Sequence, residues 1–141
     1  MFPVNGSEDA GGLIVPLLPT TPVMSYDIQL VDPVTKKALH AQEPHQITGG
    51  TCAMGGTTEL WLNITYNYSS HYYRAFGENG IRTIYGMTGA ASIPVLQDAI
   101  SSLGDDVNDD YWAPTEGNAK RALCQLVALA QLRPDGAWSG D

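Results

Sequence analysis

An alternating stretch over residues 57–68 constrains the fold more than any other part of the sequence. Apolar side chains occupy every second position, at Leu60, Leu62, Ile64, Tyr66 and Tyr68. The intervening positions are Glu59, Trp61, Asn63, Thr65 and Asn67. A repeat of two residues is typical of a β-strand, because successive side chains point to opposite faces. The pattern predicts a central strand over about 58–68 with one face toward the core and one polar face.

Two further segments predict an N-terminal hairpin. Residues 25–31 alternate in the same way, and residues 32–36 read Asp-Pro-Val-Thr-Lys, which has the chemistry of a turn. Residues 37–41 then return as a second strand, and residues 46–47 are a candidate for a short third strand. The first half of the chain therefore predicts an antiparallel sheet.

Helical patterns fill the second half of the chain. Ser92 is a suitable N-cap for a helix over about 92–103, which Gly104 closes. Thr115 caps a last helix, so that the helical segment covers about 115–132, and shorter helices are predicted over 71–76 and 80–86. The fold class that follows is α+β, with an N-terminal antiparallel sheet packed by C-terminal helices.

A chain of 141 residues has the length of one ordinary domain. Residues 1–23 are rich in Gly, Pro and Thr and predict a flexible or extended arm, so the single α+β domain is expected to span 24–141. The apolar run at 13–18 is short and interrupted by Pro16, which suits neither a signal peptide nor a membrane span. We therefore expect a cytoplasmic protein without a membrane partner.

The charge balance argues against direct nucleic-acid binding. The chain has 15 acidic and 7 basic residues, for a net charge of −8, and its few bases are scattered. Neutralising a phosphate backbone requires clustered Lys and Arg. Cys52 and Cys124 form no CxxC pair and are expected to be reduced thiols, with Cys124 as a small core residue on the last helix. His40, His45 and Glu43 are a weak metal set, so neither a metal nor a cofactor is predicted.

Three groups of residues are candidates for a ligand or partner site. The polar face of the central strand offers amides beside an indole at Trp61, Asn63, Thr65 and Asn67; the alternative is a sheet with one solvated face. A repeated Gly-Gly-Thr could hold a phosphate through backbone amides at Gly49, Gly50, Gly55 and Gly56; the alternative is a plain connector. The start of the last helix presents Asp110, Trp112 and Lys120; the alternative is an ordinary capped helix.

Catalytic motifs are weak in this sequence. His71 follows the central strand and is the best candidate for a general base. Ser69, Ser70 and Cys52 are the local nucleophile options, and none stands in an elbow motif. A hydrolase using His71 with Glu59 or an acid from 105–110 is therefore a secondary hypothesis.

Several segments together resemble a group of small proteins from phages, prophages and other mobile elements. These are the two Gly-Gly-Thr motifs at 49–51 and 55–57, Leu-Asn-Ile-Thr-Tyr-Asn-Tyr at 62–68, Gly-Asp-Asp-Val at 104–107, Asp-Tyr-Trp at 110–112, Thr-Glu-Gly-Asn-Ala-Lys at 115–120 and Arg-Pro-Asp-Gly-Ala-Trp at 133–138. The resemblance covers about residues 25–141 and supplies a biological context without catalytic residues. Small acidic phage proteins of this kind often act by binding.

The first hypothesis is therefore a non-enzymatic binding protein that inhibits a bacterial defence system in the host cell cytosol. Its partner is either a host defence protein, bound by direct contact, or a small nucleotide that it sequesters. A structural or assembly protein of the virion is the alternative, and it predicts a defined homo-oligomer. The hydrolase is the second alternative.

Overall fold

The computed structural model describes residues 25–47 and 56–140 and confirms the α+β class. Its strands are β1 (Ser25–Val31), β2 (His40–His45), β3 (Thr57–Glu59), β4 (Trp61–Thr65) and β5 (Ala137–Gly140). Its α-helices are α2 (Ser69–Phe76), α3 (Gly89–Ser101) and α4 (Glu116–Leu132). Two 3-10 helices, η2 (Tyr66–Tyr68) and η3 (Gly80–Ile84), complete the fold.

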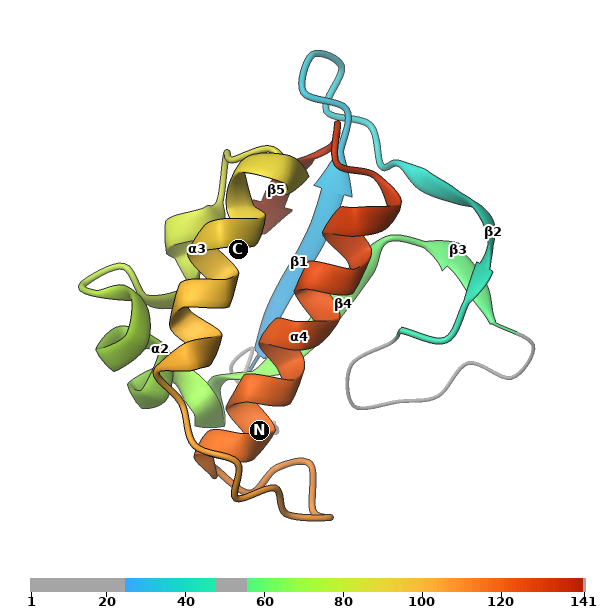
Figure 1. Ribbon diagram of the computed structural model, residues 1–141. Helices are drawn as coiled ribbons and strands as arrows, with labels where there is room; N and C mark the ends of the chain where they lie inside the picture. Colours follow the sequence, from blue (N-terminus) through green and yellow to red (C-terminus); the bar gives the residue numbers. More distant parts are fainter. Residues whose placement is uncertain (1–24, 48–55, 141) are drawn as a thin grey trace, which may run out of the picture.

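The main sheet has three antiparallel strands in the order β4-β1-β5, so β1 lies at its centre (Figure 1). Ile28 is opposite Leu62 on one side and opposite Gly140 on the other. The apolar positions of β1 and β4 are buried, whereas Asp27, Gln29 and Trp61 are exposed. The predicted alternation is therefore confirmed along these two strands.

The third strand of the main sheet, β5, comes from the last described residues of the chain, so the sheet is not built from N-terminal strands alone. Trp138 in β5 is only 2% exposed. Its indole Nε1 donates a 2.7 Å hydrogen bond to the buried Ser92 Oγ. The outer edge of β5 is also occupied, because Trp138 exchanges backbone hydrogen bonds with Gly86 and Met87.

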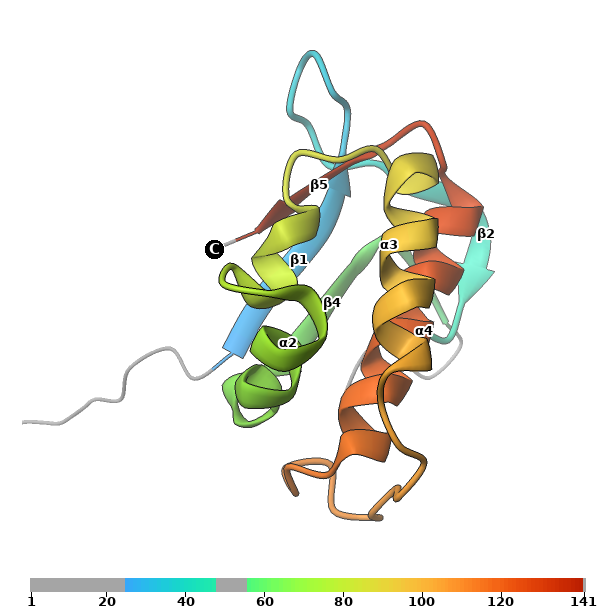
Figure 2. The same cartoon turned by 60° about the vertical axis from the view of Figure 1, so that its left-hand side comes forward.

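Helices cover one face of the main sheet. In Figures 1 and 2, α3 and α4 lie side by side, and α4 passes in front of β1 and β4 in Figure 1. The buried residues of α4 recur at helical spacing, at Ala119, Ala122, Leu123, Leu126, Leu129 and Ala130. Thr115 caps α4 as predicted, with its side chain accepting a hydrogen bond from the Asn118 N–H. The opposite face of the sheet carries the exposed polar positions of β1 and β4.

The predicted central strand over 58–68 is not continuous. The chain leaves one sheet and enters another at Leu60, because β3 pairs with β2 and β4 pairs with β1. The strand then ends at Thr65, whose side chain accepts a hydrogen bond from the Asn67 N–H and so begins η2. This turn brings Tyr68 into the core, where its side chain is fully buried.

The predicted N-terminal hairpin is only partly present. Asp32 Oδ1 accepts hydrogen bonds from the N–H groups of Val34 and Thr35, which confirms the turn. After the turn, however, β1 and the returning chain share only the bridge between Val31 and Ala38. Strand β2 instead pairs with β3 in a separate two-stranded sheet that stands away from the main sheet in Figure 1, and residues 46–47 form no strand.

Two details of the helices differ from the prediction. Helix α3 begins at Gly89 with Thr88 as its N-cap, whereas Ser92 lies inside the helix and is fully buried. A serine can satisfy its hydroxyl inside a helix by bonding a preceding carbonyl, and Ser92 Oγ donates to the Gly89 carbonyl at 2.8 Å. Cys124 is exposed on α4 and is not a core residue, because the core-facing positions beside it are taken by Leu123 and Leu126.

Buried tyrosines tie η2 and α2 to the chain around α4. The Tyr68 hydroxyl donates to the Tyr111 carbonyl, and the Tyr72 hydroxyl donates to the Ala119 carbonyl at 2.9 Å. Burial raises the pKa of Tyr68 to about 12, and the neighbouring Tyr111 contributes. Burial also raises the pKa of Tyr72 well above its ordinary value.

Because Tyr68 and Tyr72 have raised pKa values, we expect the free energy of unfolding to fall at high pH. Their folded-state pKa values lie above the ordinary value of about 10, so the folded state favours the neutral phenols. The stabilisation is fully present below about pH 10, and it is lost as the pH rises from about 10 through the folded pKa. We expect the urea midpoint to fall over this range, and to fall less steeply in Tyr68→Phe. A midpoint with the same pH dependence in both proteins would contradict the assignment.

Candidate functional site

The open face of the main sheet carries a polar group of residues around one tryptophan. We call the group formed by Asp27, Gln29, Glu59, Trp61 and Asn63 the Trp61 surface. The strand register places Gln29 opposite Trp61 and Asp27 opposite Asn63. Paired residues of an antiparallel sheet point to the same face, so side chains from two strands meet here.

Hydrogen bonds fix the polar side chains of this surface. Asn63 Nδ2 donates to Asp27 Oδ1 at 2.7 Å and to Ser25 Oγ at 2.8 Å. Trp61 Nε1 donates to Glu59 Oε1 at 2.9 Å. The indole is 42% exposed although its ring nitrogen is satisfied. The surface therefore offers an oriented aromatic ring to a partner.

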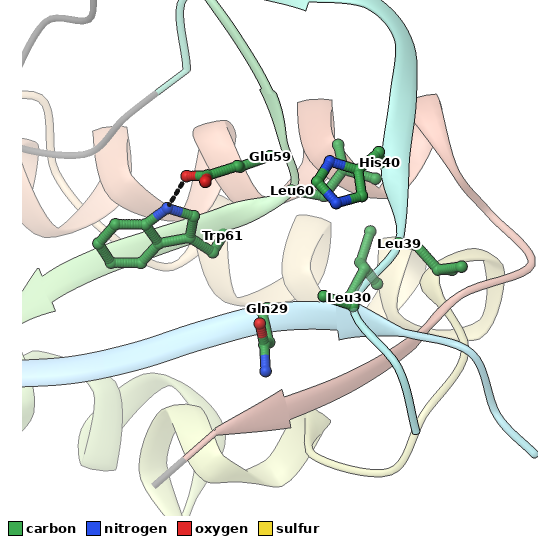
Figure 3. Close-up of a pocket in the computed structure, with 8 residues that line it drawn as sticks. Gln29, Leu30, Leu39, His40, Glu59, Leu60 and Trp61 are labelled. Atoms are coloured by element: carbon green, nitrogen blue, oxygen red, sulfur yellow. Dashed lines mark hydrogen bonds between the residues drawn. The ribbon is translucent and has the colours of Figure 1, made fainter. Parts of the chain in front are cut away.

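Two pockets adjoin the Trp61 ring. The larger, which we call the Trp61 pocket, has a volume of about 320 Å³. Figure 3 shows its lining, with Trp61 on one side, His40 on the other and the Glu59 carboxylate next to the indole nitrogen. The smaller pocket has a volume of about 160 Å³ and is lined by Asp27, Ile28, Gln29 and Trp61. An exposed indole between two pockets is a typical anchor for a binding partner.

Two of the four predicted polar-face residues do not belong to this surface. Thr65 is buried, with its hydroxyl used to begin η2. Asn67 lies in η2, and its side chain donates to the Trp112 carbonyl at 2.8 Å. The reason is the end of the strand at Thr65, after which the period-two pattern no longer describes the direction of side chains. Of the predicted group, Trp61 and Asn63 remain together.

The second predicted site lies at the start of α4, where the chain satisfies its own helix terminus. The Gly117 N–H donates to Asp106 Oδ1 at 3.0 Å, in addition to the cap from Thr115. Lys120 Nζ forms an ion pair of 2.6 Å with Asp105. Asp110 accepts from the Trp112 N–H, and the Trp112 side chain is 55% exposed. Asp110, Trp112 and Lys120 therefore surround a helix start whose first amides already have acceptors.

Asn118 bonds three backbone groups of this region, and it was not predicted as a site residue. Its side-chain oxygen accepts from the Asn108 N–H, and its side-chain nitrogen donates to the carbonyls of Asp110 and Ala113. Asn118 is only 1% exposed. A buried amide that saturates three backbone groups fixes the conformation of the loop over residues 105–114, which we call the Trp112 loop.

The connection between the Trp112 loop and the main sheet runs through one hydroxyl. The Tyr111 hydroxyl donates to the Asn63 carbonyl at 3.0 Å and accepts from the Thr65 N–H at 3.2 Å. It occupies the outer edge of β4 in the place of a neighbouring strand. Thr65 lies four residues beyond Trp61, which corresponds to about 13 Å along a strand. The Trp112 loop therefore meets the far end of β4 from Trp61.

The glycine candidates divide between described and undescribed parts of the chain. Gly49, Gly50 and Gly55 lie outside the described residues. Gly56 has a φ of 81°, and a Cβ there would come within 3.0 Å of the His45 carbonyl oxygen. Gly56 therefore allows β3 to pass close to β2, which is a structural reason for glycine at this position.

The histidines have structural partners. His71 Nε2 lies 2.7 Å from the Pro114 carbonyl oxygen, and its Nδ1 lies 3.4 Å from Arg74 Nη2. The ring therefore donates to a backbone carbonyl and holds no nucleophile. His45 Nε2 lies 2.6 Å from the Glu59 carbonyl oxygen, and its Nδ1 accepts from the Ile47 N–H. Within residues 25–47 and 56–140, no three acidic, histidine or cysteine side chains gather as metal ligands would.

Two residues of the Trp61 surface, Asp27 and Gln29, were not predicted as site residues, and Glu59 and His40 were considered only for a hydrolase and for a metal set. Asp27 and Gln29 alternate outward along β1, but nothing in the sequence places them opposite Trp61 and Asn63. Glu59 and His40 come together through the pairing of β2 with β3. Such contacts join segments about 20 to 35 positions apart in the sequence, where local patterning carries no signal.

Comparisons with protein-family models, with curated proteins and with solved structures find no match to this chain. Over the described residues, no helix has both the length and the apolar character that crossing a membrane requires. A function for this chain therefore has to be inferred from the Trp61 surface and from the resemblance of its motifs.

Replacing Asn118 with alanine should destabilise the domain. The substitution leaves the Asn108 N–H without its acceptor and removes one of two donors from the carbonyls of Asp110 and Ala113, at an expected cost of about 1–3 kcal/mol in the free energy of unfolding. Asn79→Ala is the matched control, because Asn79 is exposed and makes no side-chain cap. Urea unfolding of both variants measures the difference, and equal midpoints would contradict the role given to Asn118.

Truncation of the two tryptophans of the main sheet should destabilise the domain to different extents. Trp138→Ala empties a core position and is expected to cost about 3–5 kcal/mol in the free energy of unfolding. Trp61→Ala removes a side chain that is 42% exposed, so we expect about 1 kcal/mol or less. Denaturant unfolding followed by far-UV circular dichroism provides the comparison. A loss for Trp61→Ala as large as that for Trp138→Ala would show that the indole serves the fold.

Proposed function

We propose that this protein is a non-enzymatic binding protein that acts by contact with another protein through the Trp61 surface. The observation that carries the proposal is the exposed Trp61 ring, oriented by Glu59 and bordered by two pockets. Tryptophan is enriched among the residues that contribute most to protein–protein affinity. Covering such a ring in a complex removes apolar surface from water, which favours binding.

The identity of the partner rests on the motifs shared with phage and mobile-element proteins. In that context, we propose that the bound protein is a component of a bacterial defence system, which the complex inhibits in the host cytosol. His71 bonds a backbone carbonyl, and this favours binding over hydrolysis as the activity of the chain.

Sequestration of a small nucleotide is the second candidate, because the Trp61 pocket has room for a base beside an aromatic ring. The residues that line the Trp61 pocket do not suit a phosphate group. The described residues that line this pocket include Glu59 and no Lys or Arg. Native mass spectrometry of the protein as purified separates the two candidates, because a retained mass of a few hundred daltons would favour the nucleotide.

The anti-defence proposal predicts a measurable rescue of phage growth. The protein is expressed in a panel of bacterial strains that each carry one defence system, and plaque formation by a sensitive phage is counted. We expect rescue in at least one strain, and loss of that rescue with Trp61→Ala, because truncating an anchor of this kind weakens binding by about 30-fold or more. Absence of rescue in every strain would contradict the proposal.

Two further variants make this test specific. Val34→Ser removes an apolar side chain that is 86% exposed at the turn after β1, and it should rescue as well as the unmodified protein. Trp112→Ala removes the other exposed indole, which lies in the loop that the Tyr111 hydroxyl joins to the far end of β4. Loss of rescue with Trp112→Ala but not with Trp61→Ala would transfer the binding surface to the Trp112 loop.

A further inference from the structure

The lining of the Trp61 pocket combines an apolar base with a polar rim. Figure 3 shows Leu30, Leu39 and Leu60 on one side of the space and the Trp61 ring on the other. Gln29, His40 and Glu59 supply the polar groups of the lining. A pocket of this composition suits a side chain with an apolar stem and a polar end.

The Glu59 carboxylate determines the charge of the group that this pocket can hold. Its Oε1 accepts from the Trp61 indole, while no described residue donates to its Oε2. One carboxylate oxygen therefore has no donor within residues 25–47 and 56–140 and can accept one from a bound molecule. The ring that Glu59 orients offers its π face to a cation, within the same pocket.

The remaining charges near the pocket favour a cation as well. Asp27 lies on the other side of Trp61, where it lines the smaller pocket. Arg133 lies near the pocket, because it donates a 3.2 Å hydrogen bond to the carbonyl of the lining residue His40. Its guanidinium is paired with both carboxylate oxygens of Asp135, at 3.0 and 2.8 Å, which offsets its charge.

We propose that the Trp61 pocket receives a positively charged side chain, arginine or lysine, from the bound protein. The carboxylate of Glu59 pairs with the charged end, the indole of Trp61 stacks on it, and the partly exposed Leu39 contacts its aliphatic stem. The partner therefore presents a basic surface, which the net charge of −8 complements. This inference rests on the proposed function, since it names the chemistry of the protein that covers the Trp61 surface.

The test uses a small probe and the full chain, so it needs no knowledge of the partner. N-acetyl-arginine-N-methylamide is titrated into ¹⁵N-labelled protein, and the Trp61 indole N–H signal is followed by NMR after its assignment with Trp61→Phe. The matched probe carries citrulline, which has nearly the same shape and no charge. We expect a saturable shift with arginine and binding about tenfold or more weaker with citrulline.

Protein variants then locate the charge that the probe recognises. Glu59→Gln keeps an oxygen that can accept from the Trp61 indole but removes the carboxylate, so the arginine probe should bind about tenfold or more weakly. Asp98→Asn makes the same change of charge on the exposed side of α3 and should leave binding unchanged. Equal binding of the arginine and citrulline probes, or unchanged binding in Glu59→Gln, would overturn the proposal.

The outcome also separates this inference from the proposed function. If Trp61→Ala abolishes phage rescue while the arginine probe fails to bind, the Trp61 surface remains the binding surface and the cationic side chain is wrong. If the probe binds as expected while Trp61→Ala retains full rescue, the pocket holds a cation but the proposed function is wrong.

Discussion

The pairing of β1 with strands from two distant parts of the chain is the constraint on which the rest of the structure depends. Its partners β4 and β5 begin at residues 61 and 137, so neither hairpin geometry nor short loops impose the arrangement. The burial of one apolar face supplies the driving force, because β1 and its neighbours press that face against α3 and α4. Trp138 then joins β5 to α3 through the hydroxyl of Ser92.

The Trp61 surface is a consequence of the change of sheet at Leu60. Strand β3 belongs to the small sheet and β4 to the main one, so Glu59 and Trp61 flank a corner of the chain. The corner lets the carboxylate bond the indole and leaves a pocket between the two sheets. If one strand continued straight through Leu60 in a single sheet, a neighbouring strand would occupy the space of this pocket. The change of sheet that interrupts the predicted strand over 58–68 therefore also creates the Trp61 surface.

At the end of β4 far from Trp61, polar side chains attach the Trp112 loop to the domain through hydrogen bonds. Asn118 and the Tyr111 hydroxyl bond backbone groups of the Trp112 loop and of the outer edge of β4. They attach an acidic loop to the domain, and the carboxylate of Asp106 in this loop accepts from the Gly117 N–H of α4. Asp105, Asp106 and Asp110 thus have partners within the domain, whereas Glu59 keeps one oxygen without a donor among the described residues.

Local patterning by itself determined the elements of this protein, and tertiary structure decided how they combine. The alternation of β1 and β4, the cap at Thr115 and the turn at Asp32 were predictable because each depends on neighbours within a few residues. The same alternation predicted that the strand continues to Tyr68, and this was wrong because the Thr65 hydroxyl caps η2 and the strand ends there. The recruitment of β5, the pairing of β2 with β3 and the meeting of Gln29 with Trp61 depend on contacts between distant segments. Such contacts form because together they bury the most apolar area. A local repeat in the sequence cannot predict them, since this area depends on the whole fold.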